Sequence, residues 1–95
     1  MSKLKEKLTR KVAGIILKYV KAEKGRLTRI SEDARINRKE FNIRGLSMMK
    51  LHRLLRITHA LYLELSFDEF AMMMNEINDT IIEYGENYDY TLLDE

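Results

Sequence analysis

The chain has 95 residues, of which 45% are hydrophobic and 34% charged, so it is long enough for one folded domain and too short for two. It contains no cysteine, which excludes disulfides, thiolate zinc sites and cysteine nucleophiles and favours a reducing compartment. No segment approaches the ~20 apolar residues of a membrane span, so we expect a cytoplasmic protein.

The charged residues are segregated along the chain. All 17 lysines and arginines lie at or before Arg56, together with five acidic residues, so residues 1–59 carry a net charge of +12. Residues 60–95 carry ten acidic residues and no lysine or arginine, which gives a net charge of −10. The first part therefore has the charge of a polyanion-binding surface, and the second part would repel a polyanion.

The residue usage favours helices. Proline is absent, only four glycines occur, and β-branched residues form no long alternating run. Apolar residues at helical spacing predict a first helix over about residues 3–23, which Gly25 would end. Thr28 is the expected N-cap of a short second helix over about residues 28–35.

A third short helix is expected to begin at Asn37, a good N-cap residue, and to run toward Arg44 before Gly45. The second and third helices would then meet at a tight turn. A fourth helix is expected to open at Ser47. Its apolar stripe, which we expect to face the core, consists of Met48, Leu51, Leu54, Leu55, Thr58, Leu61 and Tyr62.

A fifth helix closes the predicted domain. Ser66 and Glu69 form an S-x-x-E capping box at its start, and it would run to about Tyr84 and end at Gly85. Its apolar residues lie on more than one face, so one small body cannot cover them all. We expect the leftover apolar surface, within residues 71–84, to form a homodimer contact.

The domain is predicted to span residues 1–85, followed by an acidic C-terminal tail over residues 86–95 that has no clear hydrophobic period. Two interpretations of this tail remain open. It either faces away from the basic part of the chain and improves solubility, or it folds back on the basic surface and competes with phosphate.

The segment from residue 30 to residue 41 carries a motif in its apolar residues and its turn. Its apolar positions are filled by Ile30, Ala34, Ile36 and Phe41. Asn37 stands where a new helix would begin. This segment resembles the helix-turn-helix of the lambda repressor-like family, also called the Cro or Xre type, and the resemblance extends over about residues 10–72.

The chain differs from the family pattern in three places. Arg35 replaces the small residue or glycine of the turn, so a side chain with a Cβ must accept the backbone of that turn. Ser31 replaces the usual alanine and places a hydroxyl in a tightly packed position. The stretch from Phe41 to Gly45, at the end of the third predicted helix, is at least one residue shorter than in the family pattern.

The resemblance implies an all-α, five-helix lambda repressor-like domain with an extended C-terminal helix. Such a protein would be a sequence-specific double-stranded DNA-binding transcriptional regulator, acting through residues 28–44 in the major groove. Arg38 would then read guanine, Asn42 would pair with adenine, and Thr28 and Arg29 would contact phosphate. The candidate DNA-contacting residues are Thr28, Arg29, Asn37, Arg38, Lys39, Asn42, Arg44 and Lys50.

Catalytic and metal chemistry find little support in the sequence. His52 and His59 are seven positions apart on one predicted helix, about 10.5 Å along its axis, which is too far for a shared metal ion. No glycine-rich phosphate loop occurs. We therefore expect no enzyme activity, no metal and no cofactor. The alternative function is a protein-interaction module, such as an antitoxin-like partner-binding domain that has kept the fold, with the acidic C-terminal half as its working surface.

Overall fold

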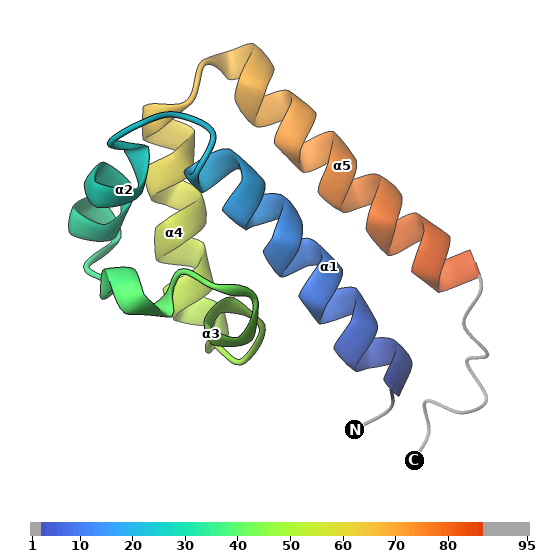
Figure 1. Cartoon of the computed structure of the whole chain (residues 1–95). Helices are drawn as coiled ribbons and strands as arrows, with labels where there is room; N and C mark the ends of the chain where they lie inside the picture. Colours follow the sequence, from blue (N-terminus) through green and yellow to red (C-terminus); the bar gives the residue numbers. More distant parts are fainter. Residues whose placement is uncertain (1–2, 87–95) are drawn as a thin grey trace.

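The computed structural model describes the backbone of residues 3–86 and the side chains of residues 6–85, so the predicted tail lies outside the described residues apart from its first position. The regular elements in chain order are α1 (Lys3–Val20), α2 (Arg26–Ala34), a 3₁₀ turn η1 (Arg38–Glu40), α3 (Ile43–Ser47), α4 (Leu51–Glu64) and α5 (Phe67–Glu86) (Figure 1). Within this part of the chain there is no strand, and the predicted all-α, five-helix architecture is confirmed.

Helix α1 runs through the middle of the fold. It packs against α3 on one side and against α5 on the other, while α2 packs against α4. Figure 1 shows α5 alongside α1, with η1 and α3 on the far side of α1 from α5. The acidic helix α5 and the basic residues that follow α2, in η1 and α3, therefore lie on opposite sides of the molecule.

The core draws on all five α-helices. Its most completely buried side chains are Val20, Ile30, Leu46, Ile57, Leu61 and Met73. Truncating a buried aliphatic side chain of this size to alanine costs about 2–5 kcal/mol. The short helix α3 is held on α1 by Leu46, so the region around it is anchored although it contains little regular structure.

The boundary between α1 and α2 differs from the prediction. Helix α1 ends at Val20, and the Arg26 guanidinium donates a hydrogen bond of 2.9 Å to the Tyr19 carbonyl in its last turn. Helix α2 begins at Arg26, because Gly25 adopts a left-handed conformation (φ 85°) that starts the helix earlier than expected. The prediction of Thr28 as N-cap is therefore wrong, and Thr28 lies within the first turn of α2.

The predicted continuous third helix is also wrong. Asn37 does act as an N-cap, accepting a hydrogen bond of 2.9 Å from the Lys39 backbone N–H, but it caps only the three-residue turn η1. The backbone then becomes extended at Asn42, whose side chain caps α3 by accepting from the Gly45 N–H at 2.7 Å. Gly45 lies inside α3, where a Cβ would come within 2.2 Å of the Glu40 carbonyl oxygen.

Helix α4 begins at Leu51, after the N-cap Lys50, and not at Ser47, which ends α3. Its buried face is formed by Ile57, Ala60 and Leu61. The predicted core stripe is wrong for most of its members, because α4 carries apolar residues on two neighbouring faces and only one of them meets the core. The exposed members of that stripe are Met48, Leu51, Leu55 and Tyr62.

Half of the predicted capping box is present at the start of α5. The Glu69 backbone N–H donates to the Ser66 hydroxyl at 3.1 Å, while the Glu69 carboxylate binds Arg26 in place of the cap. The helix continues through Gly85 to Glu86, so Gly85 does not end it. The expectation of uncovered apolar residues on this helix is confirmed, and those exposed are Phe67, Met72, Met74, Ile81 and Ile82.

Candidate nucleic-acid interface

The turn after α2 positions the candidate site. The Ile36 backbone N–H donates to the Ser31 carbonyl at 3.1 Å, and the Arg35 N–H donates to the Glu32 carbonyl at 3.3 Å, which is the Schellman pattern. Arg35 has φ 56° and ψ 46°, a left-handed conformation that favours glycine and costs an L-residue about 1 kcal/mol. The expectation that Arg35 must accept a demanding backbone is confirmed.

Two side chains, the buried Ser31 and the exposed Arg56, stabilise this turn. The buried Ser31 hydroxyl donates to the Ile36 carbonyl at 2.6 Å, so the hydroxyl that replaces the usual alanine closes the turn. From α4, the Arg56 guanidinium donates to the Ala34 carbonyl at 2.9 Å and to the Arg35 carbonyl at 3.4 Å. A cation at the C-terminal end of α2 also interacts favourably with the helix dipole. These contacts offset the strain at Arg35.

The turn η1 is attached to α4 by a two-pronged ion pair. The Arg53 guanidinium donates to both carboxylate oxygens of Glu40, at 2.8 and 2.6 Å. This hydrogen bonding lowers the pKa of Glu40 below its ordinary value. Phe41, directly after η1, is buried in the core. With Glu40 and Phe41 facing inward, the exposed side chains of η1 are Arg38 and Lys39.

Residues 35–50, which we call the basic segment, carry a concentration of uncompensated positive charge. Its exposed cations are Arg35, Arg38, Lys39, Arg44 and Lys50. Within the described part of the chain, none of these five side chains makes an ion pair or a side-chain hydrogen bond. The one acid of the segment, Glu40, is neutralised by Arg53. The basic segment therefore presents five positive charges and no free negative charge.

Helix α1 extends this basic surface. Arg10 of α1 and Arg44 of α3 both line a hollow of about 630 Å³, together with Thr9 and Ser47. Arg10 is exposed and was not among the residues predicted from the sequence. Only the packing of α3 on α1 brings it near the basic segment, and neither its spacing nor its type signals that proximity.

The predicted phosphate contacts at the start of α2, Thr28 and Arg29, lie apart from the basic segment. Arg29, predicted to contact phosphate, donates from Nε to the Glu64 carboxylate of α4 at 2.7 Å, and this hydrogen bond lowers the pKa of Glu64. Thr28 is half-buried beside it. Helix α2 has nine residues and is about 13 Å long, so the structure separates Thr28 and Arg29 from the basic segment by most of that length.

The two candidate asparagines are engaged in local structure. Asn42 uses both ends of its amide: Oδ1 accepts from the Gly45 N–H, and Nδ2 donates to the Lys39 carbonyl at 2.7 Å. A bidentate contact with adenine would use the same two atoms, so it would compete with the hydrogen bonds that cap α3 and hold the Asn42 amide in place. Asn37 uses only Oδ1, in the cap of η1, and its Nδ2 remains available.

Comparison of the chain with protein-family models, with curated proteins and with solved structures gives no match.

Among residues 3–86, no helix combines the length and the apolar character that a membrane-spanning helix needs. The same residues contain no group of three or more histidine and acidic side chains arranged to hold a metal ion, and His52 and His59 are both exposed.

Proposed function

We propose that this protein is a sequence-specific, double-stranded DNA-binding transcriptional regulator whose basic segment contacts the duplex. The observation that supports this proposal best is the set of five exposed, unpaired cations between Arg35 and Lys50, with no free acid among them. Lysine and arginine contacts to phosphate release counterions and supply most of the affinity for DNA. The acidic helix α5 lies on the other side of α1, where it would not face the duplex.

The side chains of the basic segment would take different roles. Arg38 and Lys39 stand on η1, which Arg53 and the buried Phe41 hold firmly, so they are the best candidates for contacts to base edges. Arginine most often pairs with guanine O6 and N7. Arg44, Lys50 and the neighbouring Arg10 would contact phosphates and set the position of the protein on the duplex.

The short elements limit how much sequence one copy could read. A 3₁₀ turn of three residues rises about 6 Å, and η1 is followed by an extended residue and by only five helical residues. This is much less than the continuous recognition helix expected from the sequence. One copy would therefore read only a few base pairs, and the remaining affinity would come from phosphate contacts.

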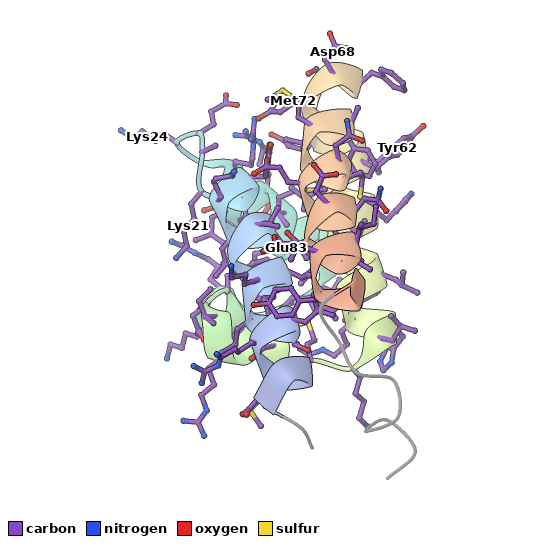
Figure 2. The ribbon with its side chains drawn as sticks, turned by 90° about the vertical axis from the view of Figure 1, so that its right-hand side faces the viewer. Lys21, Lys24, Tyr62, Asp68, Met72 and Glu83 are labelled. Atoms are coloured by element: carbon purple, nitrogen blue, oxygen red, sulfur yellow. The ribbon has the colours of Figure 1, made fainter. Side chains whose placement is uncertain are left out.

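The test begins with selection of bound duplexes from a random library, followed by fluorescence anisotropy on the selected duplex. The double variant Arg38→Ala/Lys39→Ala should weaken binding by about tenfold or more and lower the salt slope by about 1–2 units. The matched control is Lys21→Ala/Lys24→Ala, which removes the same charge from two exposed lysines in the loop between α1 and α2 (Figure 2).

The control double variant should change the affinity by less than about twofold, because the loop at residues 21–25 follows the C-terminal end of α1, whereas α3 packs near Arg10. Equal losses in the two double variants would mean that binding depends on net charge and not on the basic segment. Failure of the unaltered protein to bind any selected duplex would also overturn the proposal.

A protein-interaction function is the second candidate, and the exposed apolar side chains on α4 and α5 favour it. The salt dependence of duplex binding separates the two functions. A DNA-binding protein with several phosphate contacts loses affinity steeply as salt rises. A protein-interaction module would show weak duplex binding with little salt dependence, and its partner would bind independently of Arg38 and Lys39.

A further inference from the structure

Helices α4 and α5 each carry a row of exposed apolar side chains on one side, and we treat the two rows as one surface. Its large side chains are Leu51, Leu55 and Tyr62 on α4, and Phe67, Met74 and Ile81 on α5. Successive members are four or seven positions apart within each helix, so they share one side of the helix. We call this surface the α4–α5 face. Figure 2 shows Tyr62 on one side of α5 and Met72 on the other.

The two helices do not close this surface by themselves. They meet near their connection, where the rings of Tyr62 and Phe70 make an edge-to-face contact with centroids 5.3 Å apart. Away from that end they diverge (Figure 1). There, Leu54 of α4 and Ile81 of α5 line a hollow of about 210 Å³ together with Val12 and other residues of α1. The α4–α5 face is therefore open over most of its length.

The exposed apolar area is too large for an ordinary monomer surface. The six side chains of the α4–α5 face are 39 to 83% exposed. Counting about 200 Å² for each whole side chain of this size, their exposed parts add up to on the order of 700 Å². The largest apolar patch on a typical monomer is about 300–600 Å². Each partner in a dimer of standard size buries about 800 Å² in total, so the face supplies most of the area that a stable dimer needs.

The charged side chains of α5 lie away from the α4–α5 face. Helix α5 contains no lysine or arginine, and its exposed Asp68 and Asp79 are four and seven positions from Met72, so they share the side of α5 that carries Met72. Asp79 lines a hollow there with Lys11 and Lys18 of α1. The one acid of α4, Glu64, is paired with Arg29. The face can therefore pack against the same face of another copy without bringing these acids together.

We propose that a second copy of this chain covers the α4–α5 face, with the two copies related by a two-fold axis. The same apolar surface of each copy then packs against the other, as a two-fold interface requires. This assignment places in the interface the α4 residues that the sequence pattern assigns to the core, in addition to the residues of α5. It does not depend on DNA binding, and it holds or fails whether or not the basic segment contacts a duplex.

Sedimentation equilibrium with charge-introducing variants tests the proposal. Leu51→Glu and Phe67→Glu each place an acid in the first turn of a helix, where the helix dipole favours it, so the fold should be preserved. The unaltered chain should be a dimer at tens of micromolar, and each variant should weaken dimerisation by about tenfold or more. Met72→Glu is the matched control, because Met72 is exposed on α5 outside the face, and its dimer should persist.

Cross-linking gives a second test that does not perturb packing. The chain has no cysteine, so single cysteines can be introduced without interference. A mixture of Leu55→Cys and Met74→Cys copies should give cross-linked dimers with a short bismaleimide linker, and Met72→Cys copies alone should give few.

Three results would overturn the proposal. One is a monomeric protein at high micromolar concentration. Another is a dimer that both glutamate variants leave intact. The third is cross-linking of Met72→Cys copies that is as efficient as that of the mixture of Leu55→Cys and Met74→Cys copies, which would place the contact outside the face.

Discussion

The two ends of helix α2 use the same residue type in opposite ways. At its N-terminal end, the buried Arg26 binds the Glu69 carboxylate at 3.0 Å, and Arg29 binds Glu64. At its C-terminal end and in the turn that follows, Arg35 and Arg38 are exposed and have no partner within the described residues. The nine-residue helix α2 therefore carries cations that hold the fold together at its N-terminal end and is followed directly by cations that face outward.

The difference lies in which acids the fold brings near each end. The acids of α4 and α5 belong to the negatively charged part of the chain. The packing of these two helices against α1 and α2 places three of the acids beside basic side chains. Glu64 and Glu69 reach α2, and Glu76 binds Lys18 and Tyr19 of α1. These ion pairs partly cancel in space the separation of charge along the sequence. In the basic segment, by contrast, the exposed cations are left without acidic partners.

The largest effect is expected at the N-terminal end of α2. Arg26→Met removes a buried guanidinium that donates to the Tyr19 carbonyl and to the Glu23 and Glu69 carboxylates, which should lower the free energy of unfolding by about 2–4 kcal/mol. The same substitution at Arg38 should change it by less than about 0.5 kcal/mol. Urea unfolding measures both. Equal stability losses would show that the two ends do not differ.

The sequence predicts this contrast only in part. The five helices, the Ser66 cap of α5 and the tight turn after α2 follow from local signals, and they are present. The pairing of Arg26 with Glu69 and of Arg29 with Glu64 does not, because these acids lie 43 and 35 positions further along the chain. The local ion pair of Arg26 is with Glu23, at 2.8 Å and three positions earlier. Charge and spacing identify a basic region, but they cannot show which cations the fold neutralises.

Some residue types in this sequence fit more than one structural role. Gly25 can end one helix or begin the next, and the structure uses it to begin α2. Asn42 can cap a helix or contact a base, and its amide is used in a cap. Helix α4 has two apolar faces, so periodicity alone could not decide whether Ile57 or Leu55 faces the core. Tertiary packing makes each of these choices.

A second effect is expected at the C-terminal end of α2. Ser31→Ala leaves the buried Ile36 carbonyl without the hydroxyl that donates to it, and should lower the free energy of unfolding by about 1–2 kcal/mol. The turn would loosen together with the attachment of η1, so DNA affinity should also fall. Urea unfolding and anisotropy report the two quantities. Ser31→Cys, which keeps most of the volume and only a weak donor, should lie between alanine and the unaltered chain.

Arg35 offers a smaller effect with opposite signs in the two measurements. Arg35→Gly relieves the left-handed backbone and should raise the free energy of unfolding by about 0.5–1 kcal/mol. It also removes one cation of the basic segment, so DNA affinity should fall by about threefold. Arg35→Ala is the control, because it removes the charge and keeps the strain. A glycine variant that binds DNA as well as the unaltered chain would exclude Arg35 from the interface.

The smallest effect concerns pH. Hydrogen bonding to Arg29 lowers the pKa of Glu64, and hydrogen bonding to Arg53 lowers that of Glu40. A carboxyl whose pKa is lowered by folding contributes stability that is fully present above its unfolded pKa, about 4.3, and is lost as the pH falls through the folded value. Both pairs are partly exposed, so solvent and salt screen the contribution.

Glu64→Gln should therefore flatten the loss of stability between pH 5 and the folded pKa, and added salt should reduce the difference between this variant and the unaltered chain. Asp33→Asn is the matched control, since Asp33 is an exposed acid of α2 that forms no ion pair within residues 6–85. Urea midpoints measured across this pH range decide the outcome. If Glu64→Gln loses stability on acidification as steeply as the unaltered chain, Arg29 is not held by Glu64 in solution. Arg29 would then belong with the outward-facing cations, and the contrast between the two ends of α2 would rest on Arg26 alone.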